Sequence, residues 1–290
     1  MESHPTWDRV LLDHWLEQAF CHDLLSKDKL SYKTSKLGKL IQTYRFHGLE
    51  ALYKEFVVHW SPAFSRLPEL ISGQSEKIIF DSEMQDELIS KVSMASELFV
   101  WPFLKNKCQK NKWQRVLDIG CGEGLYLNKL LERFPSLQGV GIEINPLVAE
   151  RAQRNSQPLG DRLKIICGDA LNLSQDIGTF DVCLLNNNIY YFSPEQRVSL
   201  LNNLKRVLQP MGQIGILTAL RESGTFSSRV FRTQIPQNLM IFFLACNQGF
   251  QGLPAEDEIR ELFLQTGYAD IEITPLPLRI SHYFFAGLSG

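Results

Sequence analysis

After residue 112 the sequence alternates short apolar segments with helical patterns, and this alternation constrains the fold more than any other feature. The apolar segments have the length of buried strands and lie at residues 115–119, 139–142, 163–167, 180–185 and 213–219. A helical pattern follows the first of them, where Leu127, Leu130 and Leu131 share one face and Pro135 ends the helix. Strands separated by helices at this spacing form parallel β-α-β units. We therefore expect an α/β fold around a mostly parallel sheet.

Two of the helices carry clear start signals. Asn145 precedes a proline, which is typical of an N-cap followed by the first helical residue. Ser193 is followed three residues later by Gln196, the pattern of a capping box. The apolar stripe of this second helix continues to Leu208, and Pro210 is expected to end it.

The end of the sequence departs from the alternation. Two further strand patterns, near residues 269–274 and 280–286, have too few residues between them for a crossover helix. They are therefore predicted to form an antiparallel hairpin. The expected sheet has seven strands and is mostly parallel, with an antiparallel C-terminal strand placed at its edge.

The first 110 residues have a different character. All five tryptophans and five of the six histidines precede Arg115, and the sequence pattern here indicates helices and few strands. Residues 105–112 contain four lysines and are expected to form a polar hinge. The predicted division is a helical N-terminal lid or substrate domain at residues 1–110 and a core at residues 111–290.

Charge and cysteine content exclude several function classes. Lys and Arg number 30 against 32 Asp and Glu, so no basic surface indicates a nucleic-acid or anionic-membrane partner. No apolar run is long enough for a membrane span, and the polar start does not resemble a signal peptide. The six cysteines lack CxxC or zinc spacing, so we expect a reduced, cytoplasmic protein without a metal site. Cys167 and Cys183 lie in apolar runs and are expected to be buried.

The most informative segment is the glycine-rich turn between the first strand and its helix. Residues 118–124 read Asp-x-Gly-x-Gly-x-Gly. Such a turn lets backbone N–H groups and a helix N-terminus approach a ligand closely. Glu143 ends the next strand, 19 residues after Gly124. This is near the spacing of a carboxylate that accepts hydrogen bonds from both hydroxyls of a ribose.

In this context the turn resembles motif I of class I S-adenosylmethionine-dependent methyltransferases. Its third glycine comes one residue earlier than in the dinucleotide pattern G-x-G-x-x-G, and a nicotinamide enzyme with an unusual turn is the alternative. Residues 168–170, after the third strand, resemble the adenine-contacting element of that family. Residues 186–188, after the fourth strand, resemble its substrate- and methionine-contacting element. The likeness covers residues 111–290 and implies a Rossmann-like fold.

The resemblance also implies a cofactor and the residues that hold it. S-adenosyl-L-methionine is the expected cofactor, with S-adenosyl-L-homocysteine as product. The residues expected to contact its methionine moiety, ribose or adenine are Asp118, Gly120, Cys121, Gly122, Gly124, Glu143, Ile144, Asp169, Ala170, Asn186 and Asn187. Cys121 is expected to be a small neighbour of the cofactor and not a nucleophile, because no base lies beside it in the sequence.

The N-terminal part has a resemblance of its own. Residues 24–38 and 60–73 look like the end of the winged-helix half of small-molecule O-methyltransferases, whose earlier part is missing or eroded here. The departure leaves both a monomer and a homodimer open. The alternative is an unrelated helical lid over the cofactor site.

Methyl transfer is an in-line displacement for which the protein mainly positions the two reactants. A base is needed only when the acceptor is still protonated. The winged-helix O-methyltransferases carry a histidine just after the fourth strand, where this sequence has Tyr190. A tyrosine with a pKa near ~10 is a poor base at neutral pH, but it can orient an acceptor. The catalytic candidates are Tyr190, which is expected to face the acceptor, Tyr191, His59 and His282.

Three functions remain open at this point. The first is O-methylation of a small, fairly apolar metabolite in natural-product biosynthesis, which the aromatic content near the site favours. The second is C- or O-methylation of a polyketide-type acyl chain on a carrier protein, for which lysines within residues 27–39 offer a docking patch. The third is an inactive scaffold that binds the cofactor. An enzyme accumulates S-adenosylhomocysteine with a suitable acceptor, whereas a scaffold does not.

Overall fold

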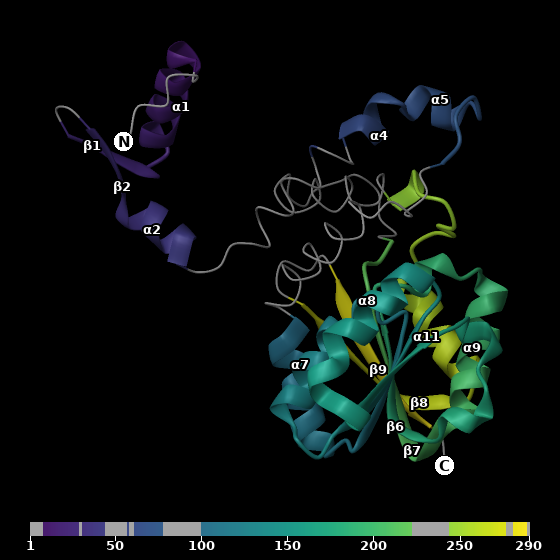
Figure 1. Cartoon of the computed structure of the whole chain (residues 1–290). Coiled ribbons are helices and arrows are strands. Elements are labelled where there is room, and N and C mark those ends of the chain that lie inside the picture. Colours follow the sequence, from purple (N-terminus) through teal and green to yellow (C-terminus); the bar gives the residue numbers. More distant parts are fainter. Residues whose placement is uncertain are drawn as a thin grey trace.

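Seven strands form one twisted sheet in the computed structural model, which describes residues 8–28, 31–43, 57, 61–77, 100–221, 244–276 and 281–288 (Figure 1). The strand order is β5-β4-β3-β6-β7-β9-β8. The strands are β3 (Arg115–Ile119), β4 (Gln138–Glu143), β5 (Leu163–Cys167), β6 (Phe180–Asn186), β7 (Leu208–Thr218), β8 (Tyr268–Pro275) and β9 (His282–Leu288). The α/β fold with a mostly parallel, seven-stranded sheet is confirmed.

The reversed strand does not lie at the edge, contrary to the expectation. β9 pairs antiparallel with both β7 and β8 and fills the place between them. The chain leaves β7, reaches the outermost position as β8, and returns through the hairpin into the gap. The segments of the hairpin were predicted correctly, but sequence spacing does not say on which side the second strand pairs.

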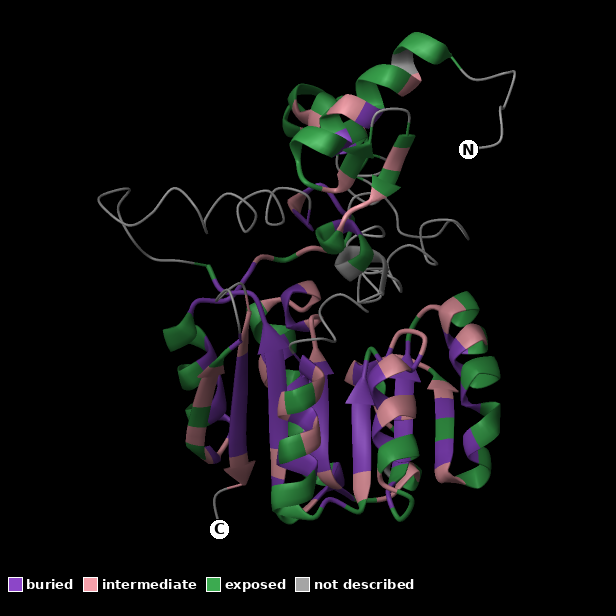
Figure 2. Cartoon of the chain, turned by 90° about the vertical axis from the view of Figure 1, so that its left-hand side faces the viewer, coloured by how far each residue is buried: buried purple, intermediate pink, exposed green. Residues whose placement is uncertain are grey.

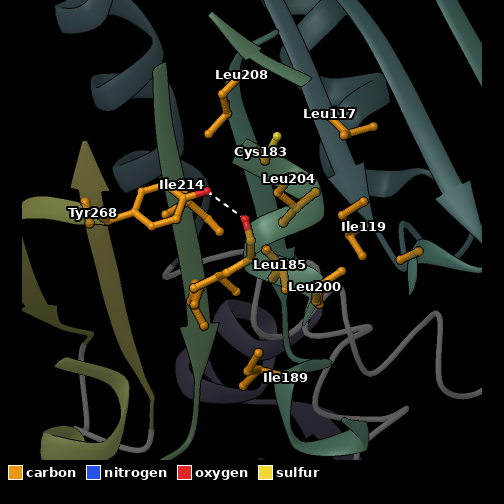
Figure 3. Close-up of a cluster of buried hydrophobic side chains, with 14 of the residues drawn as sticks. Leu117, Ile119, Cys183, Leu185, Ile189, Leu200, Leu204, Leu208, Ile214 and Tyr268 are labelled. Carbon is orange, nitrogen blue, oxygen red and sulfur yellow. Dashed lines mark hydrogen bonds between the residues drawn. The ribbon is translucent and has the colours of Figure 1, made fainter. Parts of the chain in front are cut away.

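Helices cover both faces of the sheet and bury its side chains (Figure 2). The helices of the core are α7 (Leu125–Arg133), α8 (Pro146–Ser156), α9 (Pro194–Val207) and α11 (Glu256–Gln265). On one face α9 and α11 pack on β6 and β7, and Figure 3 shows this cluster with Leu200, Leu204 and Ile214 among its members. On the other face α7 and α8 pack with residues 100–111, which are also helical. Short 3-10 segments connect these elements at η2 (Gln157–Arg162), η3 (Ala170–Asn172), η4 (Gln175–Ile177) and η5 (Ile189–Tyr191).

The predicted helix starts are confirmed. The Asn145 side chain accepts hydrogen bonds from the backbone of Leu147 and Val148, and Ser193 forms the capping box with Gln196. The end of α9 differs from the expectation, because Leu208 has extended backbone and opens β7. Leu208 pairs with β6 and is 7% exposed, so burial in the sheet ends the helix before the proline does.

Residues 105–112 do not form a hinge. Residues 100–111 are one helical stretch, and Leu104 and Cys108 are buried against the sheet. The ring of Phe103 stacks on Tyr283 with centroids 5.0 Å apart. Lys107 forms an ion pair with Glu272 of β8. The buried apolar positions Val100, Leu104 and Cys108 follow at intervals of four residues, and Lys107 beside them is buried as well, which the lysine-rich sequence does not indicate. By its contacts this helix belongs to the core, whereas the division of the chain into two domains stays a prediction.

The described N-terminal part contains a hairpin that the sequence did not reveal. Its elements are α1 (Arg9–Cys21), β1 (Leu25–Asp28), β2 (Ser31–Thr34), α2 (Lys36–Thr43), α4 (Ser61–Ser65) and α5 (Leu67–Ile71). β1 pairs antiparallel with β2, and both strands are largely exposed, so they lack the apolar alternation that marks a strand. Among the described residues, no helix has the length and apolar character needed to cross a membrane.

The α4–α5 segment packs against the core through a small apolar cluster. Ala63 of α4 and Cys246 are both buried there, with Phe64, Leu67 and Leu70 beside them. Figures 1 and 2 place this segment beyond the edge at which the parallel strands end. The N-terminal part therefore contacts the side of the core where open α/β sheets bind ligands.

Candidate active site

The predicted cofactor residues lie at the carboxyl ends of four neighbouring strands. Asp118 lies near the end of β3, Glu143 ends β4, Asp169 follows β5 and Asn186 ends β6. These strands are parallel and adjacent, so their ends meet at one edge of the sheet. The structure therefore brings together residues that are up to 68 positions apart in the sequence.

The glycine turn after β3 has left-handed backbone and a neighbour that requires glycine. Gly120 has φ +61°, and a Cβ there would lie 2.6 Å from the Asn188 amide nitrogen. That amide donates to the carbonyl of Ile119, while its Oδ1 is buried without a hydrogen-bond partner in the described part of the chain. Asn188 thus supports the turn from β6. Its role was missed, although it stands in the asparagine run that marked this strand end.

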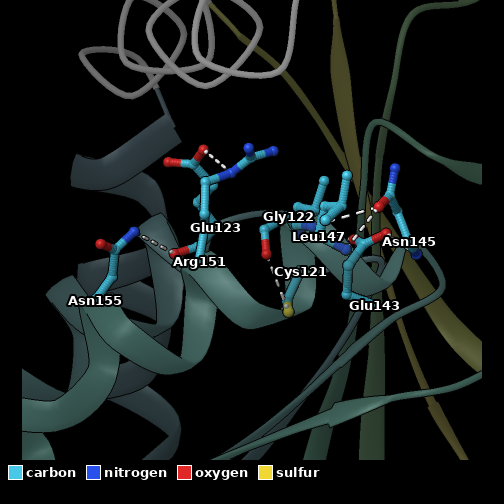
Figure 4. Close-up of polar contacts among 9 residues, drawn as sticks. Cys121, Gly122, Glu123, Glu143, Asn145, Leu147, Arg151 and Asn155 are labelled. Atoms are coloured by element: carbon cyan, nitrogen blue, oxygen red, sulfur yellow. Dashed lines mark hydrogen bonds and ion pairs between the residues drawn. The ribbon is translucent and has the colours of Figure 1, made fainter. Parts of the chain in front are cut away.

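Glu143 is held by main-chain groups on both sides (Figure 4). Its Oε2 accepts from the Gly122 N–H at 3.0 Å, and its Oε1 accepts from the Asn145 N–H at 3.0 Å. The side chain is 9% exposed. Each oxygen keeps a second lone pair, so the carboxylate can still accept from two hydroxyls.

Beside this carboxylate the rim of the site is apolar and open. Ile144 is 68% exposed and Leu147 is 47% exposed, which is unusual for large aliphatic side chains. Across the rim, Asp169 caps η3 by accepting from the Leu171 N–H at 2.9 Å, and its other oxygen accepts from the Asn172 amide. Ala170 is buried next to it. An apolar rim with one carboxylate suits a flat heterocycle that carries an amino group.

Cys167 corrects an expectation at the same place. Its side chain is exposed at the end of β5, whereas Cys183 is buried in the core as predicted. β5 is an edge strand of the sheet, so the last residue of its apolar run is not covered.

Asp118 is the most deeply buried acid of the site, at 1% exposed. The Asn186 amide donates to its Oδ1 at 3.2 Å, and the hydroxyl of Tyr283 donates to the Asn186 Oδ1 at 2.5 Å. Burial raises the pKa of Asp118 to about 7, with the charge of Glu143 adding to the rise and the Asn186 hydrogen bond opposing it. Tyr283 was not predicted, because β9 lies two strands away from β6 and no spacing links them.

The turn also contains Cys121, whose side chain points into the core. A Cβ on Gly141 would lie 2.7 Å from its sulfur, so the thiol packs over the backbone of β4. Burial raises the pKa of this thiol far above its ordinary value, and the charge of Asp118 adds to the effect. The thiolate is disfavoured, which supports the interpretation that Cys121 is no nucleophile.

Polar contacts join Glu123, which directly precedes Gly124 and α7, to two residues of α8. Glu123 forms an ion pair with Arg151 at 3.0 Å, and the Asn155 amide donates to the Glu123 carbonyl (Figure 4). These contacts fix the turn relative to the helix that follows Glu143.

Tyr190 lies in a separate, apolar cluster next to these groups. It is 8% exposed and packs with Ala219, Leu244 and Leu253. The ring of Tyr191 lies 4.9 Å from it. Burial raises the pKa of Tyr190 well above its ordinary value and that of Tyr191 to about 12, so neither hydroxyl is a base at neutral pH. Which ring meets an acceptor stays a prediction.

Backbone contacts fix the position of this cluster. Arg197 donates to the carbonyls of Ile189 at 3.1 Å and Gly252 at 2.7 Å. The Gln251 N–H donates to the Tyr190 carbonyl at 2.9 Å. The segment after β6 and the segment before α11 are thus tied together.

The histidine candidates are not part of either group. His282 begins β9 at the same edge of the sheet, opposite Thr218 of β7, with its ring 6.5 Å from that of Phe284. His59 lies outside the described residues. Within the described residues, no group of three or more histidine, cysteine or acidic side chains is arranged to hold a metal ion.

Comparisons with known proteins agree with this geometry. Residues 116–212 match a family model described as a methyltransferase domain. The chain is 24% identical over 283 residues to O-methyltransferase 12 of Dictyostelium discoideum, covering 89% of this chain and 69% of that protein. It is 23% identical over 212 residues to the probable inactive O-methyltransferase 11 of the same organism, covering 70% of this chain and 61% of the relative.

A solved structure shares the fold over almost the whole chain. Human N-acetylserotonin methyltransferase in complex with S-adenosylmethionine superposes with a TM-score of 0.75 at 12% identity, covering 98% of this chain and 84% of that chain. At this identity the likeness concerns the fold.

Proposed function

The chain belongs to the class I S-adenosylmethionine-dependent methyltransferases, and from that premise we propose that it transfers the methyl group to an oxygen of a small, largely apolar acceptor. S-adenosylmethionine is its cofactor. The observation that carries the proposal is the apolar, aromatic cluster around Tyr190, which follows β6 directly, two residues after the Asn188 whose amide donates to the end of β3.

The polar groups match the parts of the cofactor. Glu143 offers a fixed carboxylate to the ribose hydroxyls, and Ile144 offers an exposed apolar side chain to the adenine. Asp169 and Ala170 take the amino edge of that ring. Asp118, with the backbone from Gly120 to Gly124, receives the methionine end, whose ammonium and sulfonium are attracted to a buried carboxylate. The bound cofactor supplies the methyl group and the driving force of the transfer.

The apolar cluster supports an acceptor with an apolar body. Tyr190, Tyr191 and Phe250 offer ring faces and edges for stacking, and Leu244 and Leu253 complete the wall. The tyrosine hydroxyls orient an acceptor by hydrogen bonding and do not take its proton, because burial raises both pKa values. An acceptor that is not already ionised must lose its proton to another group. His282 is the described histidine at this edge and is our candidate for that role.

The test is a turnover assay with a panel of acceptors. The chain is incubated with S-adenosylmethionine and phenolic, enolic and carboxylic acceptors, and S-adenosylhomocysteine and the methylated product are measured by mass spectrometry. We expect a gain of one methyl group on oxygen for at least one apolar acceptor. Turnover only with an acyl chain on a carrier protein would replace the small acceptor by the carrier-bound one. Tight cofactor binding without turnover across the panel would instead indicate a scaffold.

His282 is tested in the same assay. His282→Gln keeps a hydrogen-bonding side chain but has no basic nitrogen. If His282 accepts the proton, its rate should fall by about 10²–10⁴ and the acidic limb of the pH–rate profile should disappear. A wild-type rate in His282→Gln would remove this residue from the proposal.

A further inference from the structure

The hydroxyl of Tyr283 belongs to a buried hydrogen-bonded chain that runs through the Asn186 amide to Asp118. The tyrosine is 0% exposed. Its ring packs with those of Phe103 and Phe285 in a three-ring cluster, at centroid distances of 5.0 and 4.9 Å, and the two phenylalanine rings lie 5.8 Å apart. This stacking leaves the ring little freedom, so the hydroxyl has a fixed place opposite Asn186, 2.5 Å from its Oδ1.

This contact supports one orientation of the Asn186 amide, the one in which the tyrosine hydroxyl is the donor. An amide oxygen only accepts hydrogen bonds and the amide nitrogen only donates them. Since Oδ1 accepts from Tyr283, the nitrogen faces the Asp118 Oδ1, at 3.2 Å. A flipped amide would place its oxygen against the carboxyl of Asp118. That arrangement is tolerable only when Asp118 is protonated and donates.

We propose that Tyr283 is a positioning residue, which fixes the amide of Asn186 so that it donates to Asp118 and thereby holds Asp118 as the carboxylate that receives the cationic methionine end of the cofactor. The inference rests on the proposed function, because it takes the contact between Asp118 and the cofactor from there. By this inference the reversed strand β9 contributes to cofactor binding indirectly, because its Tyr283 acts through Asn186.

The other groups around Asp118 make this donation matter. Glu143 faces it from β4 and Cys121 from the glycine turn, and Tyr126 of α7 faces the Tyr283 hydroxyl. Among the described residues these neighbours include no cation, and without the cofactor the Asn186 amide is the described group that opposes the effect of burial on the pKa of Asp118. A cationic ligand that needs the carboxylate should bind more weakly as pH falls below about 7, by up to tenfold per pH unit.

The experiment measures this dependence in variants. The dissociation constant of S-adenosylhomocysteine, which keeps the ammonium of the methionine end, is determined by calorimetry between pH 5.5 and 8.5. In Tyr283→Phe the ring and its stacking remain, but the Asn186 oxygen loses the donor that supports the orientation in which the amide nitrogen faces Asp118. Affinity falls on the acidic side of the pH profile, and we call this part of the profile the acidic limb. The loss of one hydrogen bond should move the acidic limb to higher pH by about half to one pH unit. Binding at pH 6 then weakens about three- to tenfold against wild type, with a difference below about twofold at pH 8.5.

Tyr268→Phe is the matched control. Tyr268 is a buried tyrosine of the neighbouring strand β8, 1% exposed, whose hydroxyl donates to the Leu201 carbonyl at 3.1 Å on the other face of the sheet (Figure 3). It loses a comparable hydrogen bond and should leave the limb in place. A limb that stays in place in Tyr283→Phe, or moves equally in Tyr268→Phe, would overturn the proposal.

A double-mutant cycle tests whether Tyr283 acts through Asn186. Asn186→Ala should move the limb at least as far as Tyr283→Phe, and adding Tyr283→Phe to it should change nothing further. Additive shifts in the double variant would overturn the proposal. An acidic limb that stays in place in Asn186→Ala would also overturn it, and this single variant is the test if Tyr283→Phe does not fold. Asp118→Asn separates the two levels. If it binds S-adenosylhomocysteine as wild type does, the assignment of Asp118 in the proposed function fails, whatever the tyrosine does.

Discussion

The edge formed by β3 to β6 presents polar groups, whereas the neighbouring cluster around Tyr190, although hydrogen bonds tie its backbone in place, presents apolar side chains. Glu143 is fixed by two backbone N–H groups, and Gly120 by its backbone conformation. The side chain of Tyr190 instead packs against Leu244 and Leu253. Polar groups at fixed strand ends suit one ligand in one orientation. An apolar wall can take a different shape when its side chains are substituted, and so can suit different ligands. The difference fits an invariant cofactor beside a variable acceptor.

The largest expected effect belongs to the polar region, at Asp118. Asp118→Asn keeps the shape of the side chain but removes the charge that attracts the methionine end. We expect the dissociation constant of S-adenosylhomocysteine at pH 8 to rise by about two decades, the loss of a buried charge-assisted hydrogen bond and its attraction. Calorimetry on the folded variant checks this.

The same variant should be more stable when empty. The folded pKa of Asp118 is raised to about 7, above its ordinary value, so the native state binds the proton more tightly than the unfolded chain. Its contribution to the free energy of unfolding therefore falls as pH rises from about 4 to about 7. At pH 8 the free energy of unfolding of Asp118→Asn should exceed that of wild type by about 2–4 kcal/mol, with no gain near pH 4. Thermal unfolding at the two pH values measures this difference. An equal gain at both pH values would contradict the assigned cause.

Glu143→Ala should have the next largest effect. Loss of both ribose hydrogen bonds should weaken S-adenosylhomocysteine by about 1.5–3 kcal/mol, or one to two decades in the dissociation constant. Asp181→Ala is the matched control, because Asp181 also accepts from two backbone N–H groups, those of Gln114 and Arg115, at the opposite edge of the sheet. Unchanged affinity in a folded Glu143→Ala protein would remove Glu143 from the site.

The two regions also differ in how far the sequence predicts them. The strand ends of the polar region follow from local patterns, since an apolar run, a glycine turn and a helix cap each act within a few residues. Glu143 and the N-cap at Asn145 were found in this way, and β3 and β5 have the predicted bounds. Asn188 was included in the predicted element at residues 186–188, but its contact with Ile119 and the whole role of Tyr283 could not be found, because these partners are set by which strands become neighbours.

The failures have the same origin. Residues 105–112 were interpreted as a hinge because four lysines dominate their sequence, whereas the structure continues a helix through them and buries Leu104 and Cys108. Leu208 was assigned to a helix although tertiary pairing with β6 draws it into β7. Either strand of the C-terminal hairpin could pair with β7, and no single residue determines that β9 does so and that β8 becomes the edge strand.

The contact of α4 with the core tests whether the N-terminal part covers the acceptor. Ala63→Glu would place a charge in the cluster with Cys246, where Ala63 is 2% exposed, and should displace α4. We expect turnover to fall at least about tenfold, with unchanged affinity for S-adenosylhomocysteine, because an uncovered edge admits water and loses the shape of the acceptor site. Ser65→Glu makes the same change at an exposed position of α4 and should have no effect. Full turnover in a folded Ala63→Glu protein would contradict the lid role.

The smallest expected effect lies in the apolar region, at the two tyrosines. Because burial raises the pKa of Tyr190 well above its ordinary value, its hydroxyl stays protonated and can only orient an acceptor. Tyr190→Phe should therefore lose about tenfold or less in turnover, the contribution of one modest hydrogen bond. Tyr191→Phe is the companion variant, since its ring packs 4.9 Å away and its hydroxyl is also protonated. Steady-state rates across pH 6–9 decide between the roles. A loss of about 10²–10⁴ in either variant, with a changed pH profile, would mean that the hydroxyl takes part in proton transfer after all. Wild-type rates in both would mean that the cluster contributes its shape alone, and that the two regions of the site differ even more than their contacts indicate.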